Sequence, residues 1–228
     1  MRDCGVHQVV GAVLPFALVV TVSPVNIVAA ILLLFSERRI LAASAYLVGF
    51  AVGVAAVLVA LELLAAEVDL SAGSDGSHAA AVVRIVLGGA FLLAATRKVR
   101  ARRHDAGGGE LPGWMDGITS FGPGKAAATG VGIGAGNPKN VAMAVAASLA
   151  IGAAGLPAAQ VAGVIALYVV IASLGVAAPL VVAVGLGDRS EPVLTSWRDW
   201  LGRNNDVVMA VLYFVFAAVL VGNGIASL

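Results

Sequence analysis

The chain has 228 residues, of which 60% are hydrophobic and 12% are charged, and its mean hydropathy is +0.99. This composition is far more apolar than that of an ordinary globular domain. The formal net charge of +1 gives no electrostatic case for nucleic-acid binding. A single cysteine, Cys4, excludes an internal disulfide and a cysteine-built metal site. Because the apolar residues form blocks of about 20 or more, long enough to cross a bilayer as helices, we predict an all-α polytopic membrane protein.

Six membrane-spanning helices are predicted along the chain. They lie near residues 9–35, 40–65, 79–97, 123–153, 157–186 and 206–227. The first and the fourth are longer than a crossing requires, which indicates a tilt or a break. Residues 1–7 are too short for a signal peptide, so the first apolar block is expected to remain as a spanning helix. The expected organisation is a first three-helix repeat over 1–97, a basic cytoplasmic linker with an interfacial segment over 98–122, and a second three-helix repeat over 123–228.

Basic residues are concentrated in the loops after the first, third and fifth predicted spans. These loops and their flanks hold 11 of the 14 lysines and arginines, whereas the opposite side carries Arg2 and the acidic segment EVDLSAGSDGSH. The positive-inside rule therefore places the basic loops in the cytoplasm and both termini outside. The stretch RKVRARRHDAGGGE is interpreted as a flexible linker that sets topology and contacts lipid headgroups, with a partner-binding patch as the alternative.

Two segments have the aromatic and basic composition of the membrane interface. In LPGWMDGITSFGPGK, Trp114 and Phe121 are expected to act as anchors. In SWRDWLGRNND, Trp197 and Trp200 lie near arginines, which predicts an interfacial helix that leads into the last span.

A weak internal repeat relates the two halves of the chain. The segment TVSPVNIVAA (21–30) aligns with AGNPKNVAMA (135–144). The matched pairs are Ser23 with Asn137, Pro24 with Pro138, Asn26 with Asn140 and, further along, Gly49 with Gly163. Because each half contains an odd number of spans, the second copy must run inverted through the membrane. Inverted repeats of this kind are typical of secondary transporters.

Both aligned motifs lie near the middle of long predicted spans. Each proline removes a backbone donor and clashes with the preceding turn, and the glycines of GVGIGAG loosen the chain just before Pro138. We therefore expect both helices to kink or break at the midplane. The freed backbone groups must face a protein interior or a wet cavity, where Asn26, Asn137 and Asn140 can satisfy them or bind a ligand. The half-helix that begins near Pro138 points its positive end at this place, which favours an anion.

Lys139 lies 14 residues beyond Lys125, which is about 21 Å deeper at the helical rise. A lysine at the centre of a membrane costs about 2.5–3.5 kcal/mol on the mild insertion scale. An acidic partner, carbonyl oxygens, water or an anionic substrate group must offset this cost. We expect a functional role for Lys139, and the alternative is a lysine that helix-end carbonyls hold for structural reasons.

The other charges inside predicted spans are Glu62 and Arg84, both near the outer end. Snorkelling to the interface is expected of them, with an ion pair between them as the alternative. The motif GFAVG (49–53) predicts packing within the chain rather than a homodimer face. The glycines of TGVGIGAG lack the strand and helix of a dinucleotide site, so packing and hinge roles are expected.

No feature of the sequence favours an enzyme. Paired carboxylates, an activated serine, metal-ligand spacing and an ATP motif are not found, and a lone lysine is not a mechanism. We therefore expect no cofactor and no metal.

A six-span chain with P-x-N in its first span and N-P in its fourth resembles the LysE-type exporter superfamily. Within it, GNPKNVAMAVAASLAI, preceded by LPGWMDGITSFGPGKA, resembles the GAP branch, the glycopeptidolipid- and sulfolipid-addressing proteins of actinobacteria. The resemblance covers essentially the whole chain. It implies a bacterial inner-membrane protein that moves a substrate outward through a central site. The residues carried over to that site are Ser23, Pro24, Asn26, Asn137, Pro138, Lys139 and Asn140.

Three functions are compatible with this resemblance. The first is export of a lipid or glycolipid by alternating access around two broken helices, powered by a gradient or a partner protein. The second is export of a small solute such as an amino acid or organic acid, although Ser23 stands where many superfamily members have glycine. The third is a non-transporting membrane adaptor for envelope-lipid export machinery. A closed polar pocket would favour the small solute, and an apolar groove open to the bilayer would favour a lipid.

Overall fold

The computed structural model describes residues 3–68, 82, 85–86, 88–90, 92–97 and 113–226. Within these ranges the chain forms α-helices and two short 3₁₀ helices, and the described residues between 82 and 97 are also helical. The elements with defined bounds are α1 (Asp3–Thr21), α2 (Pro24–Leu34), α3 (Arg39–Val68), η1 (Gly113–Ser120), α5 (Pro123–Gly136), α6 (Pro138–Gly152), α7 (Ala158–Leu186), η2 (Gly187–Arg189) and α8 (Ser190–Ala226). The predicted all-α class is confirmed for the described part of the chain.

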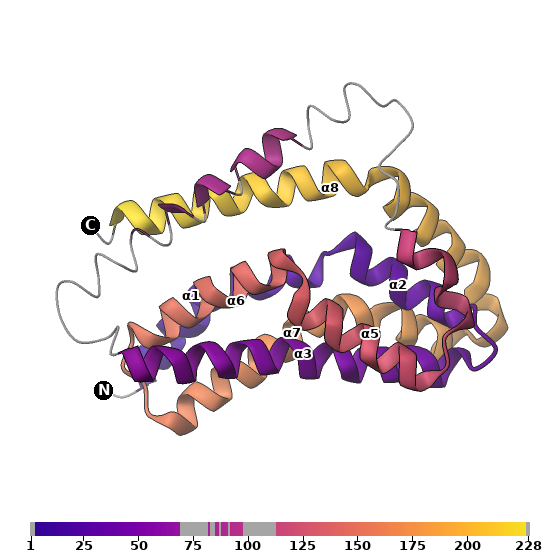
Figure 1. Ribbon diagram of the computed structural model, residues 1–228, viewed down its shortest axis with the longest axis horizontal. Helices are drawn as coiled ribbons and strands as arrows, with labels where there is room; N and C mark the ends of the chain where they lie inside the picture. Colours follow the sequence, from indigo (N-terminus) through magenta and orange to yellow (C-terminus); the bar gives the residue numbers. More distant parts are fainter. Residues whose placement is uncertain are drawn as a thin grey trace.

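Two helical runs are long and apolar enough to cross a membrane, Arg39–Ala65 and Ala158–Gly222, and α1 with α2 forms a third if the bent pair is one span. The second run has 65 residues, about 98 Å at the helical rise, which is several times the hydrocarbon thickness. It is divided at Gly187, whose φ of +55° suits a residue without a side chain. Figure 1 shows α7 and α8 running in opposite directions on either side of this turn. The chain is therefore a multi-pass membrane protein.

The six predicted spans are only partly established. The pair α5 and α6 is not among the candidate spans of the described chain. Most of the predicted span 79–97 and the basic linker from 98 to 112 lie outside the described residues.

Both predicted helix breaks are present. The axes of α1 and α2 differ by 49°, and α2 begins at Pro24. Asn137 separates α5 from α6 with an extended backbone (φ −71°, ψ 118°), and α6 begins at Pro138. Each proline occupies the first position of its helix, where its missing N–H costs nothing, but it cannot continue the helix before it.

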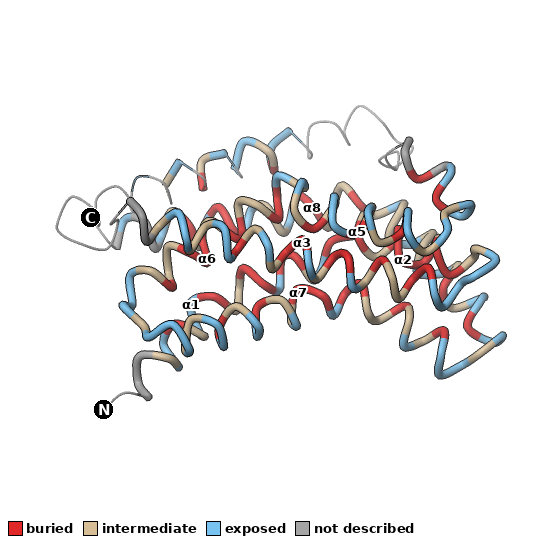
Figure 2. Tube along the Cα trace, turned by 60° about the horizontal axis from the view of Figure 1, so that its bottom comes forward, coloured by how far each residue is buried: buried red, intermediate tan, exposed pale blue. Residues whose placement is uncertain are grey.

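The broken helices of each half pack against the long helix of the other half. Helices α1 and α2 both contact α7, whereas α5 and α6 both contact α3, and α3 also contacts α7. One hydrophobic core results, with fully buried side chains from α3, α6 and α7 such as Tyr46, Met143 and Tyr168. In Figure 2 the buried residues follow the inner faces of these helices.

Glycines allow α3 and α5 to approach closely. A Cβ on Gly49 would lie 2.1 Å from the carbonyl oxygen of Ala127, and one on Gly130 would lie 2.3 Å from that of Tyr46. A Cβ on Gly134 would similarly meet the backbone of α3. The predicted packing role of GFAVG and of the alternating glycines is therefore observed within the chain. Such close contact of small residues is a common way for helices to associate in membranes.

The match of Gly49 with Gly163 does not extend to packing. A Cβ added to Gly163 would meet no atom within 4 Å. The crowded glycine on α7 is Gly175, where a Cβ would lie 1.9 Å from the carbonyl oxygen of Thr21 at the end of α1. The two halves thus share the device of a close glycine contact but place it at different heights.

Large apolar side chains cover the outside of the bundle. Val181 on α7 is 68% exposed, and Val48 on α3 and Phe214 on α8 are similarly exposed. A monomeric soluble protein rarely displays apolar surface on this scale. These faces are suited to contact with lipid chains, in agreement with the membrane assignment.

Several basic residues lie at one end of the bundle. Arg39 at the start of α3 forms a 3.0 Å ion pair with Asp188 of η2, and Arg198 of α8 lies 5.9 Å from the ring centre of Phe35. The loop after α2, η2 and the first part of α8 therefore meet. The start of α1 and the end of α8 lie at the other end of the bundle (Figure 1).

Two interfacial predictions need correction. The 3₁₀ helix η1 contacts α2 and buries Met115 and Ile118, so the segment is fixed to the core rather than lying only at the surface. The Trp114 side chain lies outside the described residues, and Phe121 is half-buried beneath the Lys125 ammonium. The expected interfacial helix before the last span is instead the first part of the single helix α8, which exposes Trp197.

We expect Gly130→Ala to destabilise the protein and Gly132→Ala to leave it unchanged or slightly more stable. Both glycines belong to α5, but only the Cβ at position 130 would strike the backbone of α3, since position 132 faces open space. Overpacking typically costs about 1–3 kcal/mol, whereas glycine to alanine inside an open helix gains about 0.5–1 kcal/mol. Thermal unfolding of the detergent-purified proteins measures both changes, and equal midpoints would contradict the close α3–α5 contact.

Candidate functional site

The central feature of the site is a buried lysine that joins the two halves. Lys139, in the first turn of α6, is only 4% exposed. Its Nζ donates a hydrogen bond of 3.1 Å to the backbone carbonyl oxygen of Val19 in the last turn of α1. Of the four ways that the sequence offers to offset the buried charge, this conformation uses a carbonyl oxygen.

The carbonyl of Val19 is available because α1 stops at Thr21. The last four carbonyls of a helix have no partner within the helix, and Pro24 cannot donate to the carbonyl of Val20. The C-terminal end of a helix also carries a partial negative charge, which stabilises a nearby cation by roughly 0.3–1 kcal/mol and by more in buried sites. The break in α1 therefore creates the acceptor that Lys139 binds.

One backbone carbonyl does not use all of the ammonium's capacity. A lysine ammonium carries three N–H donors, and among the described residues Val19 supplies the one acceptor within hydrogen-bonding distance. A hydrogen bond from a charged donor contributes about 1.5–3 kcal/mol, which is comparable to the insertion cost of the lysine. The remaining donors can serve an additional ligand without loss of this contact.

Two asparagines at the second break act on the backbone. The Asn137 side chain accepts a hydrogen bond of 3.0 Å from the Lys139 backbone N–H and so caps α6. The Asn140 side-chain amide donates a hydrogen bond of 3.0 Å to the carbonyl of Ile133 in the last turn of α5. The end of α5 is therefore satisfied from within its own half, whereas the end of α1 is satisfied by the other half.

Asn26 differs from its repeat partner because its side chain has no described function in the fold. The residue is fully buried, and neither Oδ1 nor Nδ2 has a hydrogen-bond partner among the described residues. The Oδ1 atom of Asn140 is also buried without a described partner. Burial of an unpaired amide costs about 1–3 kcal/mol, so these atoms are candidates for ligand contact.

The remaining motif residues shape the backbone. Ser23 is buried at the start of α2, but its hydroxyl does not cap that helix. Pro24 is buried, whereas Pro138 is exposed. The structure thus brings Lys139 to the end of α1 and leaves the prolines as the cause of the breaks.

Glu62 is half-buried on α3 rather than extended fully to the surface. It forms a side-chain hydrogen bond with Ser148 of α6, and its Oε1 atom is buried without a partner among the described residues. Arg84, the ion-pair partner considered for Glu62, lies outside the described residues.

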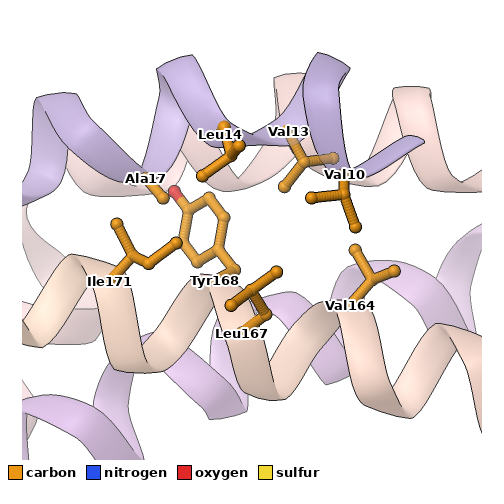
Figure 3. Close-up of a pocket in the computed structure, with 8 residues that line it drawn as sticks. All are labelled: Val10, Val13, Leu14, Ala17, Val164, Leu167, Tyr168 and Ile171. Carbon is orange, nitrogen blue, oxygen red and sulfur yellow. The ribbon is translucent and has the colours of Figure 1, made fainter. Parts of the chain in front are cut away.

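An apolar groove lies between α1 and α7, next to the α1 break. Figure 3 shows its lining side chains, which are Val10, Val13, Leu14, Ala17, Val164, Leu167, Tyr168 and Ile171. The empty space is about 180 Å³ and part of it is open to the surroundings. Tyr168 is 1% exposed, and its hydroxyl has no hydrogen-bond partner in the described chain.

Sequence reasoning missed Val19, Ser148 and Tyr168. A backbone carbonyl has no sequence signal of its own, so the acceptor at Val19 could only follow from the geometry of the break. Ser148 and Tyr168 do have a signal, because each is an isolated polar residue inside an apolar run. Within the described ranges no three His, Cys, Asp or Glu side chains are grouped so that they could hold a metal ion.

The fold and the site together define a multi-pass, all-helical membrane protein with a buried lysine between two broken helices. The chain belongs to the family described as Sap, sulfolipid-1-addressing protein, which it matches over residues 13–226. The match confirms the resemblance to the sulfolipid-addressing branch, while kinship with the wider LysE superfamily stays a prediction. No curated protein and no solved structure gives a significant match.

We expect Asn26→Ala and Asn137→Ala to have different effects on stability. Asn137→Ala removes a helix cap, so the free energy of unfolding should fall by about 1 kcal/mol. Asn26→Ala removes two buried atoms without described partners, so stability should be unchanged or higher. Thermal unfolding in detergent compares the two variants, and a large loss of stability in Asn26→Ala would assign a structural role to its side chain.

Proposed function

We propose that this protein exports a lipid with an anionic headgroup across the membrane. The observation that carries the proposal is the buried Lys139 ammonium, bound to a backbone carbonyl at the break between α1 and α2. A charge held in this way retains free donors and lies beside the positive end of α6. Such a place is suited to an anion, because helix N-termini and lysines both bind sulfate, phosphate or carboxylate groups.

The amide groups of the site complement the lysine. Asn26 and Asn140 contribute buried side-chain atoms without described partners, which include an N–H donor on Asn26 and oxygen acceptors on both residues. The oxygens can accept from the hydroxyls of a headgroup, while the donor of Asn26 and the ammonium serve anionic oxygens. A hydrogen bond between ionised partners is about twice as strong as a neutral one, so a bound anion competes well with the Val19 carbonyl for Lys139.

Three observations support a lipid over a small solute. The family description names a sulfolipid, large apolar side chains cover the outside of the bundle, and an apolar groove begins within a turn of the carbonyl that Lys139 binds. Export of a small solute and a non-transporting adaptor role remain the outcomes that would replace this proposal.

The packing pattern supports an inverted repeat with six spans. The broken helices of each half contact the long helix of the other half in the same manner. The start of α1 and the end of α8 lie at one end of the bundle (Figure 1), as an even number of crossings requires. The positive-inside rule would place the end that carries Arg39 and Arg189 in the cytoplasm of a bacterial cell, with both termini outside.

Alternating access supplies the mechanism. In the described conformation Lys139 ties α6 to the end of α1. Rocking of one half against the other would separate these helices, and the headgroup would then hold the ammonium in place of Val19. No bond in the substrate is made or broken, so the energy comes from a gradient or from a partner protein of the envelope-lipid machinery.

Lys139→Met is expected to abolish export while the protein still folds and inserts. In a deletion strain, surface-extracted lipids and secreted small metabolites are compared after complementation with wild type, Lys139→Met or Lys125→Met. Lys125 is exposed at the start of α5, so its variant controls for the loss of a positive charge. We expect a surface lipid to be lost and then restored by wild type and Lys125→Met alone.

The same experiment distinguishes the alternatives. Retention of a metabolite inside the cell with unchanged surface lipids would establish a small-solute exporter. Normal surface lipids with a well-expressed Lys139→Met protein would exclude a required charge at this position.

Asn26→Ala and Asn140→Ala are expected to reduce lipid placement to a similar extent. Each removes an amide that would contact the headgroup, and loss of a hydrogen bond to a charged partner costs about 1.5–3 kcal/mol, roughly a tenfold or greater loss of binding. The measurement is the amount of surface lipid per unit of membrane protein. An effect of Asn140→Ala alone would show that the cap on Ile133 matters and that the two asparagines do not form one site.

A further inference from the structure

The groove between α1 and α7 contains a polar group that the fold does not use. Seven of its eight lining side chains are apolar, and the eighth is Tyr168. Tyr168 is 1% exposed, and its hydroxyl has no hydrogen-bond partner in the described chain. In Figure 3 this hydroxyl points across the groove toward Ala17 of α1. A buried tyrosine hydroxyl usually finds a partner, so an acceptor from outside the chain would remove a cost of the folded state.

The groove is continuous with the lysine site. Ala17 and Val19 are two residues apart on α1, about 3 Å along the helix axis. The Thr21 hydroxyl at the end of α1 donates to the backbone carbonyl of Ile171, which lines the groove. From this closed end the groove extends along α1 to Val10 and along α7 to Val164. A molecule with its charged end at Lys139 would therefore direct its adjoining segment into the groove.

The chemistry of the lining identifies the segment. Aliphatic walls without charge exclude an ionic or sugar group, because an unpaired polar group there would lose its hydrogen bonds to water. The groove is partly open at Leu167, which is 39% exposed, so a chain could enter from the side. An empty space of about 180 Å³ is below the range of small-molecule pockets and suits part of one flexible hydrocarbon chain.

We propose that this groove binds an acyl chain of the exported lipid and that the Tyr168 hydroxyl donates a hydrogen bond to an ester or amide carbonyl where the chain joins the headgroup. Tyr168 is then a specificity-determining residue that distinguishes an acylated substrate from a bare headgroup. The link between the acyl chain and Lys139 rests on the proposed function, whereas occupation of the groove by an acyl chain can be tested without any transport assay.

The test uses the full protein in phosphatidylcholine vesicles that contain a phosphatidylglycerol with a photoactivatable diazirine on one acyl chain. After illumination, the labelled peptides are identified by mass spectrometry. We expect labelling of residues 10–17 and 164–171 to exceed labelling around Val181, a lipid-facing position of α7 outside the groove. Uniform labelling of all exposed faces would overturn the proposal, because it would indicate ordinary bilayer lipid only.

Tyr168→Phe separates a ligand role from a structural one. Removal of a hydroxyl without a described partner should not lower the thermal midpoint, whereas labelling of the groove should fall roughly two- to tenfold, the value of one neutral hydrogen bond. Unchanged groove labelling would exclude the assigned hydrogen bond.

Leu167→Trp tests entry into the groove against a matched control on the same helix. The substitution enlarges a partly exposed side chain at the groove edge, and Leu174→Trp makes the same change two turns further on, outside the lining. Groove labelling should be lost in Leu167→Trp alone, and equal labelling of the two variants would overturn the proposal. Lys139→Met serves as a separate arm: retained groove labelling with lost surface lipid keeps the acyl site, and lost groove labelling with normal surface lipid rejects it.

Discussion

The interruption of two helices inside an apolar bundle is the constraint on which the rest of the structure depends. A broken helix exposes carbonyls and amides that lipid cannot satisfy. The two breaks solve this problem differently, because Asn140 serves the end of α5 from its own half, while Lys139 crosses to Val19 at the end of α1. The second solution makes one half of the molecule a structural partner of the other, and it brings a positive charge to the place where both half-helices meet.

Close helix packing makes these breaks well-defined positions rather than loose loops. The glycines of α3 and α5 allow backbone contact along a full interface, and Gly175 of α7 admits the end of α1 at Thr21. In a membrane, where the hydrophobic effect does not drive helices together, such contact supplies much of the association energy. The polar groups at the breaks are consequently surrounded by rigid helices, and a ligand there would exchange hydrogen bonds with fixed partners.

The sequence predicted the elements whose cause is local. Pro24 and Pro138 terminate helices by their own chemistry, so both breaks could be placed to within a residue or two. The partner of Lys139 could not be predicted, because it is a backbone atom 120 residues away whose availability depends on how α1 and α6 pack. For the same reason the capping role of Asn137 could be anticipated only as one of two uses, since local and ligand-binding roles require the same side chain. The continuity of α8 was also missed, because interfacial composition does not interrupt a helix.

The departure from symmetry is the feature that gives such a repeat a direction. Two identical inverted halves would have equal energies in their inward- and outward-open states. Lys139 matches Val25 in the aligned half, so only one helix end, that of α1, receives an ammonium. The corresponding end of α5 already binds Asn140, and the two states therefore differ in free energy. A ligand can shift that balance only by its differential affinity for the two states. An anion that binds Lys139 after its release from Val19 has that difference built into its binding, which makes the cross-half hydrogen bond a threshold for the transition.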